Sequence, residues 1–360
     1  MEKLNVGIVG ATGVIGQEFV ESLFNHPWFE ISSLYASRRT AGKKYADALK
    51  DRMYVNILPQ EILEMEVYNI DDLASHKLDV CFSGLPSDIG KDVESKIAEN
   101  IDLISTSAAF RYTPEVPILI PEVNPEHAEI IKFQKERRGW KSLTAISNCT
   151  TRTLVIPLKP IYDNWGIESL HMTSMQAKSG AGEKGIREDS EYRRFASKNL
   201  LPFIENEEPK VVKETKKILG KYENGKIIDA SMKIYPTCTR VDVEDGHTES
   251  VSIKTKKACS VEEVKNAFKN FTGLPQKLDL PSAPEKPIII YDEPTSGIYD
   301  TYRPQPRLDS EAGGGMITSV GRIRNVEDEI SFVTCSHNTK IGGAKGAVLN
   351  AEYLLKKGFL

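Results

Sequence analysis

The chain has 360 residues, 40% of them hydrophobic and 27% charged, with a formal net charge of −4. These values are typical of a globular protein of about two domains. They favour neither a nucleic-acid partner nor a membrane surface, and no apolar run approaches the roughly 20 residues that cross a bilayer. The five cysteines are scattered without a C-x-x-C pair, so we expect reduced thiols, no metal site and a cytoplasmic location.

Short apolar runs alternate with helical patterns in the first part of the chain. The first helix is expected over residues 16–24, where apolar side chains recur at helical spacing. Strands separated by helices predict βαβ units and an α/β fold, with a Rossmann-type doubly wound parallel sheet. The expected strands are 5–9, 31–36, 79–83, 102–105 and 143–146.

Longer strands with partial alternation follow after Cys149 and predict a mixed, largely antiparallel sheet in an α+β domain. A final helix over 342–355 has small residues on one side, so it is expected to return to the first sheet. We therefore expect a first domain over 1–148, completed by the helical segment 340–360, and a second over 149–339. The strands expected in the second domain are 169–175, 234–243, 248–253, 287–291, 316–323 and 329–334.

The segment GIVGATGVIG joins the first strand to the first helix, with glycines at the spacing G-x-x-G-x-x-G. Small residues there let backbone N–H groups approach a pyrophosphate at the positive end of a helix. The spacing differs from the usual G-x-G-x-x-G, and the alternative is a glycine turn without a ligand. The candidate cofactor contacts are Gly10, Thr12, Gly13, Val14 and Ile15, with Ser83 and Gly84 at the end of a later strand.

The end of the second strand indicates which dinucleotide binds. NAD sites usually place an acidic residue there for the ribose hydroxyl, but this chain has no acid in YASRRT. Arginine and hydroxyl donors suit a 2′-phosphate, which favours NADP as the cofactor. Alternatively, either arginine is only an exposed residue. The candidate phosphate contacts are Ser37, Arg38, Arg39 and Thr40.

Cys149 stands between an expected strand and an expected helix, in AISNCTTRTL. A thiol at a helix N-terminus meets unpaired N–H groups and the helix dipole, both of which favour thiolate; otherwise it is a small buried hydrophobe. Pro157 predicts that the helix is short, kinked or begins later, because proline inside a helix costs roughly 3 kcal/mol or more.

A nucleophilic cysteine needs a base, and the best of the six histidines is His247. It follows the Asp245–Gly246 turn between two strands, with Arg240 seven residues before it. We expect His26, His76 and His127 in surface segments. A histidine in that context is a better partner for a cysteine at the end of a strand than a lone surface histidine.

Motifs spread over nearly the whole chain resemble the aspartate-semialdehyde dehydrogenase family of the archaeal and fungal type. They are GATGVIG, STSAAFRY, VPILIPEVN, SNCTT, MQAKSGAG, ETKKILG, TRVDVEDGHTE and HNTKIGGAKGAVLNAE. The resemblance implies an NADP-dependent enzyme of amino-acid biosynthesis that works as a homodimer or homotetramer. Its substrates would be a small molecule and inorganic phosphate.

The resemblance also implies roles for single residues. Cys149 matches the nucleophile, preceded by Asn148, and Gln176 the residue that orients the acyl intermediate. His247 matches the acid/base and Arg240 the residue that grips the substrate α-carboxylate. The remaining matches are Glu214 and Lys217 for the substrate amine and phosphate, Arg111 for phosphate, and Ser179, Gly180, Gly182 and Asn338 near the nicotinamide.

These roles imply reversible reduction of L-β-aspartyl phosphate to L-aspartate-β-semialdehyde. In the oxidative direction a thiolate adds to the aldehyde, hydride leaves, and phosphate cleaves the resulting thioester. His247 would take the thiol proton and return it in reverse, a type of catalysis that typically contributes ~10²–10⁴-fold. Arginine suits a carboxylate because its donors match it bidentately.

Two features depart from the family pattern. The chain has S-N-C where the family usually shows N-P-N-C, and residues 183–195 are heavily charged where the family is small and apolar. The nearest alternative is a malonyl-CoA or succinyl-CoA reductase on the same scaffold, and N-acetyl-glutamyl-phosphate reductase is more distant. An inactive NADP-binding regulator is the alternative from another class.

Overall fold

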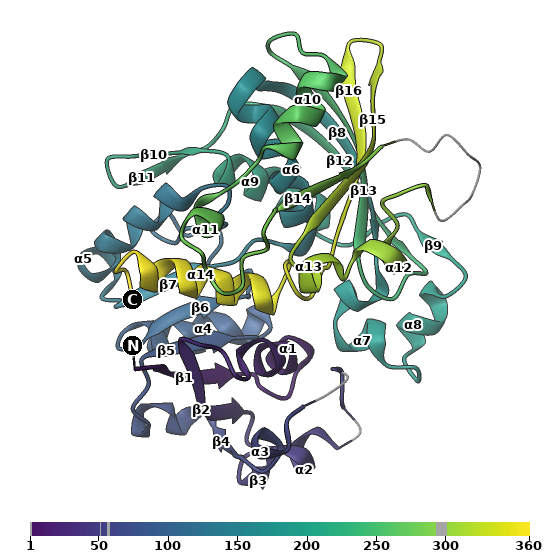
Figure 1. Ribbon diagram of the computed structural model, residues 1–360. Helices are drawn as coiled ribbons and strands as arrows, with labels where there is room; N and C mark the ends of the chain where they lie inside the picture. Colours follow the sequence, from purple (N-terminus) through teal and green to yellow (C-terminus); the bar gives the residue numbers. More distant parts are fainter. Residues whose placement is uncertain (1, 51, 56–57, 293–300) are drawn as a thin grey trace.

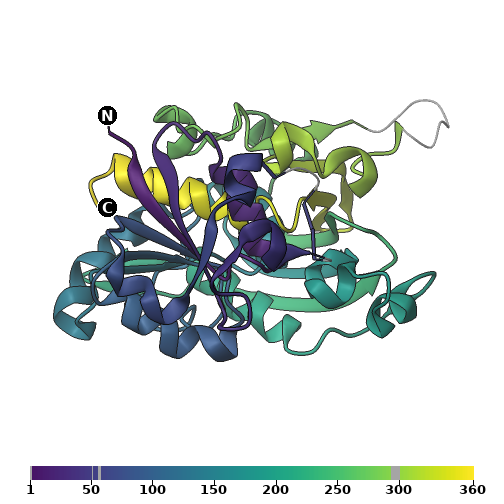
Figure 2. The same cartoon turned by 90° about the horizontal axis from the view of Figure 1, so that it is seen from below.

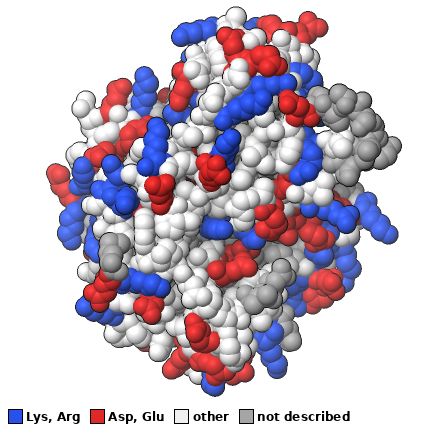
Figure 3. Space-filling view, viewed as in Figure 1, with Lys and Arg blue, Asp and Glu red and all other residues white. Residues whose placement is uncertain are grey.

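The computed structural model describes residues 2–50, 52–55, 58–292 and 301–360. They form a two-domain α/β fold in which each domain is built around one large sheet (Figure 1). No helix in these residues is long and apolar enough to cross a membrane. On the face shown in Figure 3, acidic and basic side chains are interspersed, without a large patch of one sign.

The first sheet has the strand order β3-β4-β2-β1-β5-β6-β7. Its pairs are parallel except for β3 with β4 at the edge. The strand order reverses at β1, where β2 lies on one side and β5 on the other, and ligands bind beyond the carboxyl ends of the strands at such a point. The strands are β1 (Leu4–Val9), β2 (Phe29–Ala36), β3 (Lys43–Lys44), β4 (Glu66–Asn69), β5 (Val80–Ser83), β6 (Asp102–Ser105) and β7 (Ser142–Ala145).

The second sheet has the order β14-β15-β16-β13-β8-β12-β9 and is mixed, as predicted. The pairs β8–β12 and β14–β15 are parallel and the others antiparallel. A separate hairpin joins β10 to β11. The strands are β8 (Ile167–Gln176), β9 (Leu200–Leu201), β10 (Lys221–Glu223), β11 (Lys226–Ile228), β12 (Lys233–Val241), β13 (His247–Thr255), β14 (Ile288–Tyr291), β15 (Thr318–Val326) and β16 (Glu329–Ser336).

Helices connect and cover both sheets, and short 3-10 helices (η) supplement them. Those before Cys149 are α1 (Val14–Leu23), α2 (Tyr45–Leu49), α3 (Gln60–Leu63), η1 (Ile70–Ser75), α4 (Ser87–Ala98), η2 (Pro125–Phe133) and α5 (Gln134–Arg138). The later ones are α6 (Cys149–Trp165), η3 (Lys178–Ala181), α7 (Glu183–Ile186), α8 (Glu191–Ala196), α9 (Glu207–Ile218), α10 (Val261–Lys269), α11 (Leu274–Lys277), α12 (Pro306–Asp309), α13 (Ala312–Gly315) and α14 (Ala344–Lys356).

The C-terminal helix α14 lies beside α1 and over the first sheet (Figure 2). Ala347 and Ala351 are fully buried, and such small side chains let helix and sheet approach closely. Glu352, also buried, accepts a hydrogen bond from His26 Nε2 at 2.9 Å and from the Ser282 amide at 3.0 Å. Helix α14 is thereby joined to the turn that follows α1 and to the segment around Ser282.

Helices α6, α9 and α10 cover one face of the second sheet (Figure 1). The strand β8 shows the consequence, because Leu170 and Met172 are buried while His171 and Thr173 are exposed. A strand alternates in this way when only one face of its sheet is covered. The opposite face is open in the single chain.

The helix that starts at Cys149 differs from expectation. It neither begins late nor stops early: α6 extends from Cys149 to Trp165 with both Pro157 and Pro160 inside it. Nearly every residue from Thr150 to Ile161 is buried, and burial of that much apolar surface outweighs the hydrogen bonds that two prolines remove.

Two histidines expected at the surface are buried instead. His26 is paired with Glu352, and His127 bonds Asn124 at 2.9 Å and the Gly220 carbonyl oxygen at 3.2 Å. Hydrogen bonds satisfy both polar rings in the interior, and the partners Glu352 and Gly220, which are distant in sequence, leave no local pattern.

Candidate active site

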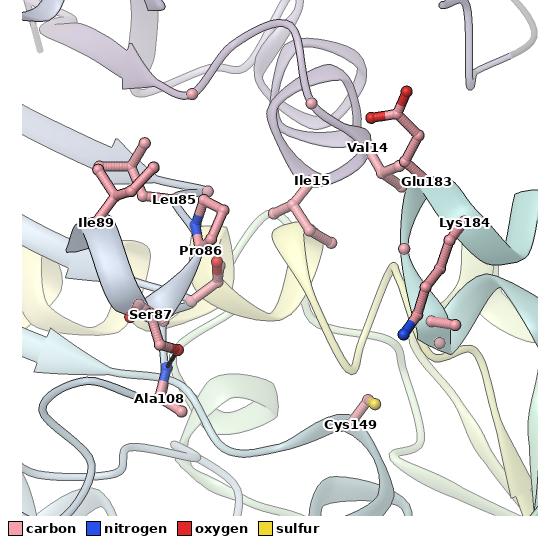
Figure 4. Close-up of a pocket in the computed structure, with 18 of the residues that line it drawn as sticks. Val14, Ile15, Leu85, Pro86, Ser87, Ile89, Ala108, Cys149, Glu183 and Lys184 are labelled. Carbon is pink, nitrogen blue, oxygen red and sulfur yellow. Dashed lines mark hydrogen bonds between the residues drawn. The ribbon is translucent and has the colours of Figure 1, made fainter. Parts of the chain in front are cut away.

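A cavity of about 1220 Å³ lies between the two domains and receives residues from both (Figure 4). It starts beyond the carboxyl ends of β1 and β5, the point where ligands bind in such sheets, and reaches Cys149 at the start of α6. The sequence-predicted residues that line it are Gly10, Thr12, Gly13, Val14, Ile15, Ser37, Arg39, Gly84, Arg111, Asn148, Cys149, Gln176, Gly180, Gly182 and Arg240.

The glycine loop forms the part of the cavity wall next to α1. A Cβ atom on Gly16 would lie 2.2 Å from the Gly10 carbonyl oxygen, so no side chain fits there. The helix begins after Gly13, and in the described residues no side chain caps it. Its first N–H groups are therefore available to an anion, which the helix dipole also favours.

The end of β2 presents only part of the predicted phosphate site to the cavity. Ser37 and Arg39 line it, whereas Arg38 is outside the lining, is 84% exposed and pairs with Asp71 at 2.8 Å. Thr40 is buried and donates to the carbonyl oxygen of Ser37.

Three other predicted cofactor residues lie behind the wall. Ser83 is buried and donates to Glu94 at 2.6 Å. The Asn338 side-chain amide donates to Ser179 Oγ at 2.8 Å and accepts from the Gly246 amide at 2.8 Å. Asn338 thus fixes the turn that precedes His247, and neither it nor Ser179 lines the cavity.

Cys149 and His247 come together although 98 residues separate them. Cys149 Sγ lies 3.3 Å from His247 Nε2, and the other ring nitrogen, Nδ1, accepts from the Ala177 amide at 3.2 Å. A backbone N–H can only donate. In the neutral imidazole the proton therefore sits on Nε2, facing the sulfur.

The surroundings keep both members of this pair uncharged in the free protein. Burial raises the pKa of the Cys149 thiol to about 11, with a further rise from the Glu207 carboxylate, opposed by Arg240 and Arg111. Burial, followed by the Arg240 charge, lowers the pKa of His247 well below its usual value. Desolvation therefore opposes the thiolate that the position of Cys149 at a helix terminus favours.

Arg240 lies beside the pair and is held in a fixed orientation. It is only 3% exposed, and its Nη1 donates to the Ala177 carbonyl oxygen at 2.6 Å and to Gln176 Oε1 at 3.5 Å. A Cβ atom on Gly180 would lie 2.6 Å from Arg240 Nη1 and 2.8 Å from His247 Cε1. The glycine thus lets η3 approach both side chains.

Glu207, at the start of α9, connects several of these groups. Its Oε1 accepts from Asn148 Nδ2 at 2.9 Å, from the Thr150 hydroxyl at 3.1 Å and from Gln176 Nε2 at 3.4 Å. The Asn148 oxygen meanwhile caps α6 by accepting from the Thr151 amide at 3.1 Å. In the short S-N-C segment, Asn148 is therefore the N-cap of α6, and Glu207 holds its side-chain amide.

Arg111 reaches the cavity from the segment that follows β6. Its Nη1 pairs with Glu214 Oε1 at 3.0 Å and its Nη2 donates to the Thr106 carbonyl oxygen at 2.9 Å. Glu214 is fully buried and its other oxygen accepts from the Asn148 amide at 2.6 Å. It therefore holds Arg111 and the Cys149 loop from behind.

Lys217 does not reach the cavity. Its Nζ donates to the carbonyl oxygens of Arg111, Thr113 and Val116 at 2.8, 3.0 and 2.8 Å, which uses the three donors of an ammonium group. Burial lowers its pKa to about 8. This geometry fixes the backbone around Arg111 and leaves no donor for a substrate.

The cavity wall also contains residues that no sequence motif indicated. Glu207, Tyr192 and Lys184 all line it. They come from segments rich in charge, where a functional residue cannot be distinguished from a solvated one without the fold. In the described residues no group of three or more His, Cys, Asp and Glu side chains is placed to hold a metal ion.

Comparisons with known proteins agree on one family. Residues 5–131 match the family model "Semialdehyde dehydrogenase, NAD binding domain" and residues 158–341 match "Semialdehyde dehydrogenase, dimerisation domain". Aspartate-semialdehyde dehydrogenase of Methanothermobacter thermautotrophicus is 41% identical, covering 98% of this chain and 99% of that protein. The enzyme of Archaeoglobus fulgidus is 42% identical, with 99% of each chain covered.

A solved structure of the same family has the same fold. Aspartate-semialdehyde dehydrogenase from Candida albicans, determined with NADP, superposes with a TM-score of 0.86 at 36% identity, and each chain is covered fully. These relatives give no support to the acyl-CoA reductase alternative.

Proposed function

Because the chain belongs to the aspartate-semialdehyde dehydrogenase family, we propose that it reduces L-β-aspartyl phosphate to L-aspartate-β-semialdehyde with NADPH, reversibly, in amino-acid biosynthesis. The observation that carries the proposal is Cys149 on the wall of a cavity that also contains two arginines and the glycine loop, with the fully buried His247 3.3 Å behind its sulfur.

The first half of the cavity suits NADP. The N-terminus of α1 offers N–H groups to a pyrophosphate, and Arg39 and Ser37 lie where the ribose phosphate of such a cofactor would be. When bound, the cofactor supplies hydride in reduction and accepts it in oxidation. The relative from Candida albicans, which was determined with NADP, supports the same choice.

Cys149 is the proposed nucleophile. In the reductive direction Sγ attacks the acyl carbon, the C–S bond forms, the C–O bond to phosphate breaks, and the thiol proton passes to phosphate directly or through His247. Hydride from the bound cofactor would then reduce the thioester carbon, the C–S bond would break with release of the aldehyde, and the Cys149 thiolate would take up a proton from solvent, directly or through His247. Covalent catalysis of this kind divides one difficult step into two easier ones.

His247 is the proposed partner that handles the proton. With its proton on Nε2, the ring donates to the sulfur, and it can also donate to the oxygen of the tetrahedral adduct. For Nε2 to accept the thiol proton, the bond from the Ala177 amide must open. We expect His247→Gln, which keeps a donor, to retain more activity than His247→Ala; equal turnover numbers would contradict the donor role.

Each charged group of the proposed substrate has a side chain of opposite charge in the second half of the cavity. Arg240 suits the α-carboxylate, with Gln176 beside it for the acyl oxygen, and Arg111 suits the phosphate. Glu207, which faces the same space, is the carboxylate proposed for the substrate ammonium group. Glu214 and Lys217 are proposed to act behind the wall, by holding Arg111 and Asn148.

An oligomer is also proposed, through the open face of the second sheet. Exposed Tyr235 stacks on His171 there, with ring centroids 4.6 Å apart, and the matching family model carries the description "dimerisation domain". Light scattering should show a homodimer or homotetramer that Tyr235→Glu weakens. A monomer at micromolar concentration would contradict this.

The decisive experiment is reduction of NADP⁺ by the purified protein with L-aspartate-β-semialdehyde, with and without phosphate. We expect turnover that requires phosphate and falls by about 10³-fold or more in Cys149→Ser. No turnover with this aldehyde, but NADPH oxidation with malonyl-CoA or succinyl-CoA, would overturn the proposal.

A further inference from the structure

We propose that Tyr192 is a second carboxylate-binding residue, whose hydroxyl donates a hydrogen bond to the substrate α-carboxylate beside Arg240. The inference rests on the proposed function and deepens it. It concerns α8, in the charged segment 183–195 that sets this chain apart from the family pattern.

The direction of the hydrogen bond between Arg240 and Tyr192 leaves the hydroxyl proton of Tyr192 available. Arg240 Nε lies 3.1 Å from the Tyr192 hydroxyl, and a guanidinium group only donates. The hydroxyl oxygen must therefore accept this bond with a lone pair. Its own proton is left for another acceptor, and the phenol becomes a better donor because a cation bonds its oxygen.

Neither residue has used its remaining donors. Across the parts of the chain that the structure describes, no acceptor is recorded for the Tyr192 O–H and no partner for Arg240 Nη2, whereas Nη1 is held by the Ala177 carbonyl oxygen at 2.6 Å. Both side chains line the cavity. A carboxylate has two oxygens and accepts from two such neighbouring donors.

The helix that carries Tyr192 is held in place by the next residue in the chain. This residue, Arg193, pairs with Glu244 at 2.7 Å and donates to the Gly185 carbonyl oxygen at 3.1 Å. Glu244 follows β12, the strand that contains Arg240. The Arg193–Glu244 pair therefore holds α8 next to Arg240. Tyr192 is thus positioned before substrate arrives, which lowers the entropy lost on binding.

A second cation lies next to this position. The Lys184 ammonium sits 4.8 Å from the centre of the Tyr192 ring, and Figure 4 shows the Lys184 side chain directed from α7 into the cavity, toward the side where Cys149 lies. An anion bound between Arg240 and Tyr192 therefore meets positive charge on two sides. The α-carboxylate is the group of the proposed substrate that fits this field.

The test is Tyr192→Phe in the full chain, which removes only the hydroxyl. A hydrogen bond to a charged group is worth about 1.5–3 kcal/mol, or roughly a 10- to 150-fold change. We therefore expect kcat/KM for L-aspartate-β-semialdehyde to fall by about tenfold or more, while KM for NADP⁺ and the urea unfolding midpoint stay as in the wild type. Tyr222→Phe, on β10, is the matched control and should change nothing.

A second aldehyde separates recognition of the carboxylate from a general structural role. 3-Aminopropanal is the same aldehyde without the carboxylate, so its kcat/KM should be equal in the wild type and in Tyr192→Phe. An equal fall with both aldehydes, or no fall with either, overturns the inference. If the wild type turns over neither aldehyde, the proposed function itself fails, and with it the basis of this inference.

Discussion

The surroundings of the Cys149 thiol oppose its ionisation on balance, although Arg240 and Arg111 favour it. Burial and Glu207 raise its pKa to about 11, so the thiolate fraction grows about tenfold for each pH unit up to that value. We expect alkylation by iodoacetamide, located by mass spectrometry, to be slow at about pH 7 and to keep rising beyond about pH 9.

The charge variant for this prediction is Glu207→Gln. Removing the carboxylate removes a cause of the raised pKa, so labelling of Cys149 at about pH 8 should become several-fold faster. The Cys149→Ser protein gives the background from the other four cysteines. A labelling rate that levels off below about pH 8 would show that the free protein already holds a thiolate.

Arg38 and Arg39 provide a matched pair at the cofactor end of the cavity. Arg39 lines the cavity, and Arg38 pairs with Asp71 outside it. Because a phosphate contact with arginine is charge-assisted, Arg39→Ala should raise KM for NADPH by about tenfold and change KM for NADH little. Arg38→Ala should leave both constants within about twofold, and the reverse ranking would reassign the phosphate site.

Among single residues, the sequence could predict those whose residue type and position suggest a catalytic role. A cysteine at the start of a helix, a histidine after a tight turn and an arginine on the strand before that turn were predicted to meet, and the structure brings Cys149, His247 and Arg240 together. Glu207 and Tyr192 could not be predicted, because an acid or a tyrosine in a charged segment looks like surface. The sequence also could not show that Lys217 faces backbone carbonyls, since its helix alone does not fix its direction.

The turn η3 is the element that sets how closely the catalytic groups approach. Gly180 lies where a Cβ atom would come within 2.6 Å of Arg240 and 2.8 Å of His247. We expect Gly180→Ala to lower kcat/KM by about tenfold or more by displacing these side chains, with little change in the urea midpoint. Wild-type kinetics would show that η3 moves aside freely.

Element positions were predicted well where the periodicity was strong. Every expected strand lies within a few residues of an observed one, because buried apolar runs allow few other structures. The short strands β3, β4 and β9, at or next to the sheet edges, were not predicted. The helix α6 was another exception. A local rule about proline predicted a helix that is short, kinked or begins later. The helix is neither short nor late, because α6 packs between the second sheet and its neighbours.

On the scale of the whole molecule, Glu352 joins parts that are far apart in the chain. It is fully buried and bonds His26 and the Ser282 amide. Glu352→Ala leaves both donors without a partner in the interior, so we expect a loss of about 3 kcal/mol in the free energy of unfolding. Urea unfolding measures this free energy. The control is Glu99, an exposed carboxylate at the end of α4, where Glu99→Ala should change the free energy of unfolding by less than about 0.5 kcal/mol.

The same region supports the proposed domain division, 1–148 with 340–360 against 149–339. The two-domain class could be predicted from alternating elements, and the return of the last helix from its small residues. The cavity between the domains could not be predicted, because its shape depends on how the two sheets face each other.

The position of α14 has a consequence for how the protein is made. Its buried residues Val348 and Leu354 are synthesised long after the strands of the sheet that they cover. One apolar face of that sheet therefore stays uncovered on the ribosome until α14 has been made. A nascent chain stalled before α14 should bind chaperones that the released chain does not.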